Sequence, residues 1–253
     1  MDANVKHQHV EGQEETGSQA VRAQLRLREM VLDGELAAGS RITELAIVEK
    51  LGVSRTPIRA ALMRLEQEGL LQALPNGGYA VRTFTEREVS DAIEMRGTME
   101  GLSARLAAER GVPAGLLERA RFCLDQIDLL LSQSALDDVA FSEYVSLNEQ
   151  YHQLLSEMAD SDILRRELER VASLPFASPS AFAVVQANSA QARDMLVVAQ
   201  DQHRQVFDAI EQREGARAES IMREHARLAR RNLRQAMQSP MTLPAARLIR
   251  NPR

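Results

Sequence analysis

The strongest constraint on the fold comes from residues 51–70, which have the pattern of a helix presented outward by a tight turn. Gly52 lies where a preceding helix would end, Ser54 is a favourable N-cap, and Pro57 falls in the first helical turn, where its missing N–H costs little. Gly69 ends the helix. Apolar residues recur at i, i+4 and i+7, so one face is apolar: Ile58, Leu62 and Leu65.

The polar side of this helix carries arginines. Arg55, Arg59 and, less squarely, Arg64 lie away from the apolar face. A short helix with Thr56 and arginines near its N-terminal end suits the major groove of DNA, where arginine reads guanine edges and hydroxyl groups hold phosphates. A lone helix of this kind could equally be a surface helix with solvated arginines, so the flanking sequence decides between the two.

Both flanks favour DNA binding. Upstream, residues 44–51 form a short amphipathic segment that the Gly-Val-Ser link joins to the arginine-bearing helix as a helix-turn-helix. Downstream, residues 70–74 and 79–82 read as two strands around a turn that contains Gly77 and Gly78. Residues 41 and 42 are a further short strand. A helix-turn-helix followed by a hairpin is a winged helix, which we place at residues 20–82, with double-stranded DNA as its partner.

The net charge of −5 looks unfavourable for a DNA-binding protein, so its distribution matters. Residues 20–82 hold nine Lys/Arg and seven Asp/Glu, a net of +2, whereas residues 83–253 hold 21 and 25, a net of −4. Affinity for DNA would then depend on the local arginine cluster, doubled by dimerisation and strongly salt-dependent.

The remainder of the chain predicts helices. A capping box at residues 85–88 begins a long helix, and further helical segments are expected at about 114–133, 136–159, 161–173, 188–213 and 216–238. We therefore expect a mainly α protein whose second domain, residues 83–238, is an all-α bundle. The polar residues 1–19 are predicted to be disordered and the proline-containing residues 239–253 to be a flexible tail. One cysteine and no apolar run of about 20 residues indicate a cytoplasmic protein without a membrane segment.

Three histidines and an asparagine of the bundle could meet at one point. Asn148 and His152 are four residues apart on one helix and face the same way. His203 and His225 lie about 11 residues on either side of the turn near Gly215, so an antiparallel helix pair places them at a similar depth. Such a group suits a borderline divalent metal such as Zn or Ni. The alternative, separate polar or core histidines, stays open on spacing alone.

Two stretches carry a family resemblance. The segments 39–44, 51–59 and 65–71 and the Gly77-Gly78 wing resemble the winged-helix domain of the GntR family of bacterial transcription regulators. Residues 95–109, 148–152, 203–210 and His225 resemble the all-helical effector-binding and dimerisation domain (FCD domain) of its FadR subfamily.

The resemblance implies a homodimeric regulator, expected to be a repressor of a catabolic or uptake operon, that reads a pseudo-palindromic operator. It also implies a metal on Asn148, His152, His203 and His225, with Asn148 where a carboxylate is common, and a carboxylate-binding role for Arg96. Spacing alone favours an ion pair of Arg96 with Glu100 equally. The effector would be a small organic acid. Two alternatives are a metal-dependent hydrolase tethered to nucleic acid and a purely structural metal.

Overall fold

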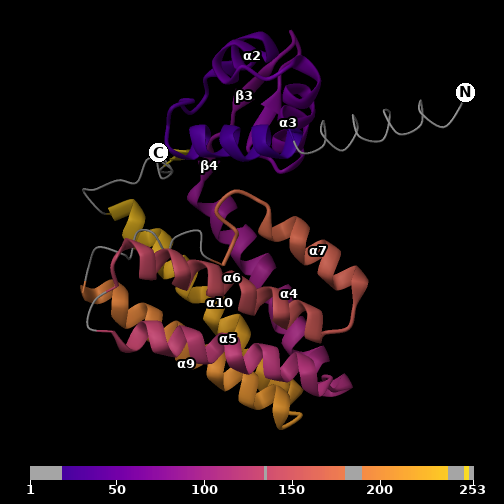
Figure 1. Cartoon of the computed structure of the whole chain (residues 1–253), viewed down its shortest axis with the longest axis vertical. Helices are drawn as coiled ribbons and strands as arrows, with labels where there is room; N and C mark the ends of the chain where they lie inside the picture. The colour runs from indigo at the N-terminus through magenta and orange to yellow at the C-terminus, as the bar shows by residue number, and fades with distance from the viewer. Residues whose placement is uncertain (1–18, 134–135, 180–189, 239–247, 251–253) are drawn as a thin grey trace, which may run out of the picture. The chain divides into compact units, whose positions relative to one another are not determined.

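The structure, a computed structural model, describes residues 19–133, 136–179, 190–238 and 248–250 (Figure 1). The chain divides into two compact units, one within residues 1–86 and 243–253 and the other within residues 87–242. The first unit contains the predicted winged helix, and the second contains the predicted helical bundle.

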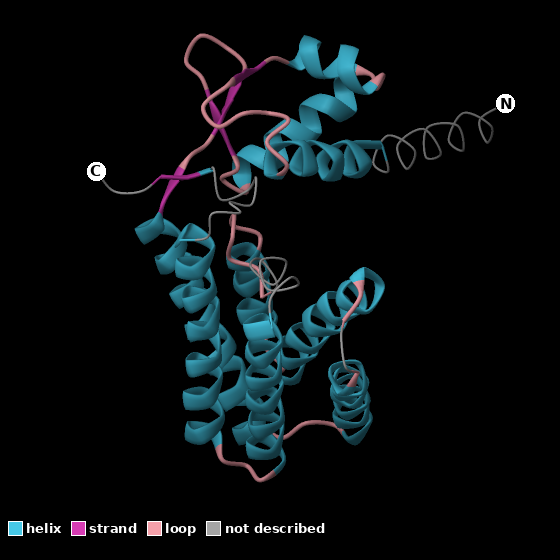
Figure 2. Ribbon diagram, turned by 90° about the vertical axis from the view of Figure 1, so that its left-hand side faces the viewer, coloured by secondary structure: helices cyan, strands magenta, loops and turns pink. Residues whose placement is uncertain are grey.

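The N-terminal unit has the element order of a winged helix. A helix over residues 19–32 precedes strand β1 (Arg41–Ile42), helices α2 (Glu44–Leu51) and α3 (Arg55–Gln67), and strands β2 (Leu71–Ala73) and β3 (Tyr79–Val81). The strands form an antiparallel sheet in the order β1-β3-β2 (Figure 2). The predicted helix-turn-helix, hairpin and short additional strand are all confirmed.

The ends of α2 and α3 follow from local chemistry. The Thr43 hydroxyl accepts a hydrogen bond from the Ala46 N–H and caps α2, and Gly52 ends that helix with a φ of 66°. Helix α3 ends at Gln67 with Glu68 as its C-cap, and Gly69 follows with a φ of 74°. There the N–H of Leu70 donates to the Leu65 carbonyl and the N–H of Gly69 to the Glu66 carbonyl, which is a Schellman motif. Ile58, Leu62 and Leu65 are fully buried, as their spacing predicted.

The wing turn between β2 and β3 depends on glycine. Gly77 and Gly78 both have a φ of 80°, and a Cβ on Gly78 would lie 2.7 Å from the Ile42 carbonyl oxygen. Arg41 holds the turn from the neighbouring strand, since its Nη2 donates to the carbonyls of Asn76 (3.1 Å) and Gly77 (2.9 Å).

Part of the C-terminal segment is a β-strand, whereas the sequence predicted a flexible tail. Residues 239–253 were expected to be a flexible tail, yet Ile249–Arg250 form strand β5, which pairs in parallel with β4 (Phe84–Thr85). Leu248 and Ile249 are buried, so two adjacent apolar residues attach this segment to the first unit. The prolines and arginines around these two apolar residues led to the prediction of a flexible tail. Of residues 1–19, which were predicted to be disordered, residue 19 begins the first helix and residues 1–18 lie outside the described residues.

The second unit is a helical bundle. Its described helices are α4 (Glu86–Arg110), α5 (Ala114–Ser132), α6 (Asp138–Met158), α7 (Asp162–Ala172), α9 (Ala190–Glu211) and α10 (Gly215–Gln238). Helix α9 packs against α10, and α5 packs against both α6 and α9 around one apolar core. Among the described residues, no helix combines the length and the apolar character that crossing a bilayer would require.

Two glycines let α4 and α10 approach each other closely. A Cβ on Gly97 would lie 2.3 Å from the Cβ of Ala226, and one on Gly101 would lie 2.7 Å from Cγ of Arg223. Ala226 follows His225 directly, so this contact also fixes how far His225 lies from α4. Larger residues at either position would separate the two helices.

We expect Gly97→Ala to destabilise the protein by about 1–3 kcal/mol, since an added methyl group has no space against Ala226. Gly115→Ala is the matched control, because nothing lies within 4 Å of its added Cβ and alanine favours helix by about 0.5–1 kcal/mol. Thermal unfolding of both variants measures the difference. Equal melting temperatures for the two variants would contradict the close contact.

Candidate nucleic-acid interface and metal centre

The N-terminal part of α3 presents its polar side chains to solvent. Arg55, Thr56 and Arg59 are exposed, whereas Pro57 and Ile58 are buried beneath them. Ser54 occupies the N-cap position, but its side chain makes no capping hydrogen bond, unlike the expectation for a good N-cap. Arg55, Thr56 and Arg59, three of the predicted DNA-contacting residues, are therefore accessible to solvent.

Arg59 forms an ion pair with a carboxylate of its own unit. Its Nε and Nη2 donate to the two carboxylate oxygens of Glu44, at 2.8 and 2.9 Å. The hydrogen bond from Arg59 lowers the pKa of Glu44. A bidentate guanidinium–carboxylate pair has the same fork geometry as arginine on a guanine edge, so binding of Arg59 to DNA would replace this exposed pair.

The other predicted DNA-contacting residues lie away from the N-terminal part of α3. Arg64 is exposed near the C-terminal end of α3, and its Nη1 donates to Oε1 of Gln24 at 3.4 Å. Gly77 and Gly78 form the wing turn described above. These placements are compatible with contacts to the DNA backbone from both parts.

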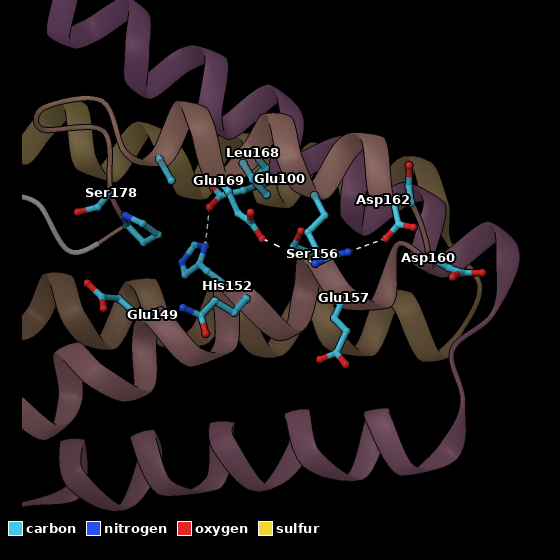
Figure 3. Close-up of a pocket in the computed structure, with 15 residues that line it drawn as sticks. Glu100, Glu149, His152, Ser156, Glu157, Asp160, Asp162, Leu168, Glu169 and Ser178 are labelled. Carbon is cyan, nitrogen blue, oxygen red and sulfur yellow. Dashed lines mark hydrogen bonds and ion pairs between the residues drawn. The ribbon is translucent and has the colours of Figure 1, made fainter. Parts of the chain in front are cut away.

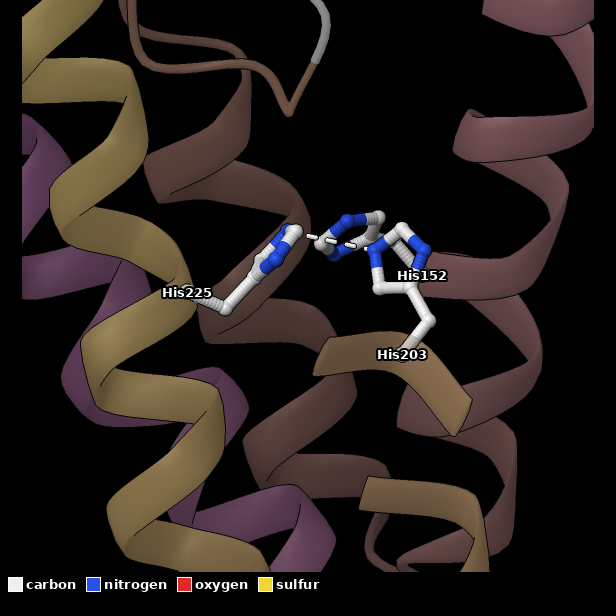
Figure 4. Close-up of side chains that lie close together, drawn as sticks. All are labelled: His152, His203 and His225. Carbon is white, nitrogen blue, oxygen red and sulfur yellow. Dashed lines mark hydrogen bonds between the residues drawn. The ribbon is translucent and has the colours of Figure 1, made fainter. Parts of the chain in front are cut away.

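In the helical unit, the three histidines meet as their spacing predicted. His152 on α6, His203 on α9 and His225 on α10 are buried, and one ring nitrogen of each lies within 4.8 Å of the others (Figure 4). Nε2 of His203 and Nε2 of His225 are 3.1 Å apart. The prediction that the antiparallel pair places both rings at one depth is confirmed.

For His152 and His203, a neighbouring side chain determines which of the two ring nitrogens faces the centre of the histidine cluster. Nδ1 of His152 lies 2.7 Å from Oε1 of Glu100, a carboxylate that can only accept, so Nδ1 carries the proton and Nε2 keeps its lone pair. That Nε2 is buried and has no hydrogen-bond partner among the described residues. A ligand nitrogen backed by a carboxylate is the usual arrangement behind a metal-bound histidine.

Gln200 has the same effect on His203. The amide Nε2 of Gln200 donates to the Leu124 carbonyl (3.0 Å) and to Asp128 (2.8 Å), which turns its oxygen toward Nδ1 of His203 at 3.2 Å. Nδ1 of His203 therefore donates and its Nε2 lone pair faces the centre. The i, i+3 spacing of Gln200 and His203 was the available signal, and sequence reasoning missed it.

The electrostatics favour the neutral form of His203 and His225 and the ionised form of Glu100. Burial holds the pKa of His203 and of His225 well below the usual histidine value. Burial alone would raise the pKa of Glu100, but Arg96 and His152 outweigh it and lower that pKa to about 2. Neutral imidazoles with an ionised carboxylate behind one of them are the protonation states that a divalent metal requires.

Arg96 is fully buried. Its Nη1 forms an ion pair with Oε2 of Glu100, four residues along α4, at 2.8 Å. This ion pair is the alternative that spacing predicted for Arg96. With Asn148, His225 and Asn232 it also lines a cavity of about 40 Å³, room for a few waters. Nε of Arg96, Nδ1 of His225 and Oδ1 of Asn232 are buried there without a hydrogen-bond partner among the described residues. Asn148 thus lies in the same small polar space as His225.

These residues fit a metal ion. Three neutral imidazoles, two of them with an oriented and available Nε2, form a donor set that borderline metals such as Zn²⁺ and Ni²⁺ prefer. The amide oxygen of Asn148 is a further candidate donor on α6. When bound, such a metal would supply a positive charge and exchangeable positions for an anion.

We expect Glu100→Gln to weaken metal binding by about 10- to 100-fold, because the carboxylate orients His152 and increases its basicity. Glu109→Gln is the control, since Glu109 lies on the same helix in an exposed pair with Arg105. Competition with a chelating dye measures both affinities. Unchanged metal affinity in Glu100→Gln would contradict the assigned role.

A larger pocket opens beside His152. It measures about 740 Å³ and lies along α6 and α7, with Glu100, Glu149, Ser156 and Glu169 among its lining residues (Figure 3). Ser156 is buried and its Oγ has no hydrogen-bond partner among the described residues. The histidine cluster is therefore next to a space that could hold a small organic molecule.

Comparisons with known families agree with the two-unit division. Residues 19–81 match the family model described as "Bacterial regulatory proteins, gntR family", and residues 91–228, more than half of the chain, match the FCD domain. The first match contains α3 and the wing, and the second contains all three histidines.

Individual relatives are more distant. The chain is 25% identical to the HTH-type transcriptional repressor RspR of Escherichia coli over 84% of this chain and 87% of that protein. It is 29% identical to YdhC of Bacillus subtilis, an HTH-type transcriptional regulator, where the match spans 58% of this chain and 64% of the relative, slightly less than two thirds. Among solved structures, E. coli McbR/YncC has a TM-score of 0.61 at 17% identity, covering 83% of this chain and 93% of that one, which shows a shared fold.

Proposed function

This chain belongs to the GntR family of bacterial regulatory proteins, with an FCD domain, and is a transcription regulator rather than an enzyme; we propose that it is a dimeric repressor controlled by a small organic acid at a metal centre. The regulated genes would serve uptake or catabolism of that acid. The protein would act in the cytoplasm, where its operator is accessible.

One observation carries the sensing part of this proposal. Three buried imidazoles from three helices converge, and Glu100 and Gln200 turn the Nε2 lone pairs of His152 and His203 toward their common centre. A purely apolar core would not require these polar groups, whose burial is unfavourable without partners. A metal held there gives an anionic ligand a charged anchor, and the pocket beside His152 gives it space.

The DNA-binding part rests on the exposed face of α3. A two-fold dimer presents two such helices, so the operator would be a short pseudo-palindrome with half-sites in successive major grooves. Arg55, Thr56 and Arg59 would contact bases and phosphates, while Arg64 and the wing glycines would approach the backbone or minor groove. The relative RspR is named a repressor, which supports the proposed direction of control.

Regulation requires the acid to bind the DNA-competent and DNA-incompetent states with different affinity. A ligand that bound both states equally would leave the operator occupied however tight its binding. The proposal therefore predicts that acid and operator affect each other's affinity by the same factor.

A thermal-shift screen of carboxylic acids, with metal-loaded and chelator-treated protein, tests this proposal. We expect one class of acid to raise the melting temperature only when metal is present, without conversion of the acid. Stabilisation by the metal alone, with no response to any acid, would favour a structural metal. Turnover of an acid would contradict the regulatory reading.

A further inference from the structure

The pocket beside His152 has a strongly acidic lining. Six carboxylates face it, against a single guanidinium, that of Arg165, among the described lining residues: Glu100, Glu149, Glu157, Asp160, Asp162 and Glu169. A ligand that carried only negative charge would enter this space against an unfavourable potential. The negative charge of the lining therefore restricts which ligands can bind, in addition to the requirement that the ligand bind a metal.

Most of these carboxylates are already neutralised by neighbours. Glu100 is paired with Arg96, Glu157 with Arg119 (3.4 Å), and Asp162 with Arg165 (2.6 Å). Glu169 lies 4.0 Å from Arg165. Within the described part of the chain, Glu149 and Asp160 have no ion-pair partner, so they are the lining carboxylates available to a cationic group.

A buried polar atom also points to a ligand in the same pocket. Oγ of Ser156 is buried and lacks a hydrogen-bond partner among the described residues, and it lies next to His152, whose Nε2 we assign to the metal. His152 and Ser156 are one turn apart on α6, and Glu149 is one turn before His152 on the same helix face (Figure 3). The exposed carboxylate of Glu149 thus lies about 4.5 Å of helical rise from His152.

We propose that the ligand of this pocket is a short zwitterion, a carboxylate with an ammonium group a few carbons away. The inference rests on the proposed function, because it names the ligand class of the same site. The carboxylate end lies at His152 and its metal, where the Ser156 hydroxyl donates to it. The ammonium end lies at Glu149 and offsets the negative charge of the lining.

The same helix geometry limits the length of the ligand. Asp160, the other carboxylate without an ion-pair partner among the described residues, lies beyond the C-terminal end of α6, whose last residue, Met158, is already about 9 Å of helical rise past His152. A two- to four-carbon spacer reaches Glu149 but not Asp160. Short amino acids are therefore favoured over long ones.

Calorimetric titration of the metal-loaded full chain tests the proposal with two matched pairs, β-alanine against propanoate and 4-aminobutanoate against butanoate. We expect the ammonium-bearing member of each pair to bind about two- to fivefold more tightly, the upper part of the range for a contact with an exposed carboxylate. Glu149→Gln removes this preference. Glu143→Gln, an exposed carboxylate on α6 outside the pocket, leaves it intact. Ser156→Ala weakens both members of each pair equally.

Several results separate this inference from the proposed function. Equal or tighter binding of propanoate and butanoate, unaffected by Glu149→Gln, would overturn the zwitterion and leave acid sensing intact. Binding of propylamine as tight as that of β-alanine would also overturn it, because the carboxylate end would then be dispensable. No response to any carboxylate or amino acid would overturn the proposed function itself.

Discussion

Arg59→Ala is expected to abolish specific operator binding while leaving the protein folded. Arg59 is exposed on α3 and already holds a bidentate partner, so its guanidinium is presented in the geometry that reads guanine. A dimer loses two such contacts. Each discriminates about tenfold to a hundredfold, so we expect affinity for the operator to fall on the order of 10²- to 10⁴-fold.

The measurement is fluorescence anisotropy on DNA selected by the wild-type protein from a random pool. Arg22→Ala is the matched control, since Arg22 is an exposed arginine of the helix over residues 19–32 and lies outside α3. It removes the same charge and should only weaken binding modestly and uniformly across sequences. If Arg59→Ala and Arg22→Ala reduced operator affinity equally, α3 would not be the reading helix.

His203→Ala is expected to have the largest effect on the helical unit. Its ring is fully buried, and its Nε2 lies 3.1 Å from that of His225 at the centre of the cluster. A zinc site with four ligands binds with roughly 10–16 kcal/mol, so loss of one ligand should weaken metal binding by about two to three orders of magnitude. Elemental analysis after dialysis, together with competition against a chelating dye, measures this loss.

Two comparisons make the result specific. The double variant His7→Ala/His9→Ala removes two histidines of the N-terminal segment and should retain the full metal content. The melting temperature of chelated wild type and chelated His203→Ala separates loss of metal from loss of folding. A His203→Ala protein that kept its metal would show that the cluster is not the binding site.

The winged helix was predictable in detail because its signals are local. Thr43, Gly52 and Gly69 mark helix ends through their own hydroxyl or backbone conformation, and the structure has all three boundaries. The convergence of His203 and His225 was predictable for a similar reason, since a short turn between two helices fixes the relative depth of residues equally distant from it.

Features that depend on tertiary contacts were less accessible. Glu100 was considered only as a partner for Arg96, but its second oxygen holds His152 on another helix, 52 residues away. The strand at residues 249–250 depends on a partner 165 residues earlier in the chain. No periodicity in either segment indicates its partner, because such pairings are fixed only when the helices and strands pack.

The acidic pocket illustrates the same limit. Glu149, Glu157 and Asp162 look like ordinary solvated charges of α6 and α7, which is how most such residues behave. Only the packing of α7 beside α6 makes them walls of one cavity next to His152.

The central claim is that a ligand at the histidine cluster controls DNA binding. Its most direct measurement is operator affinity for metal-loaded protein, with and without the ligand identified by the thermal-shift screen, in wild type and His203→Ala. We predict that the ligand changes wild-type affinity at least about fivefold, the lower end of allosteric coupling, and leaves the variant unchanged. Operator affinity that did not respond to the bound ligand in wild type, or responded equally in both proteins, would contradict the account.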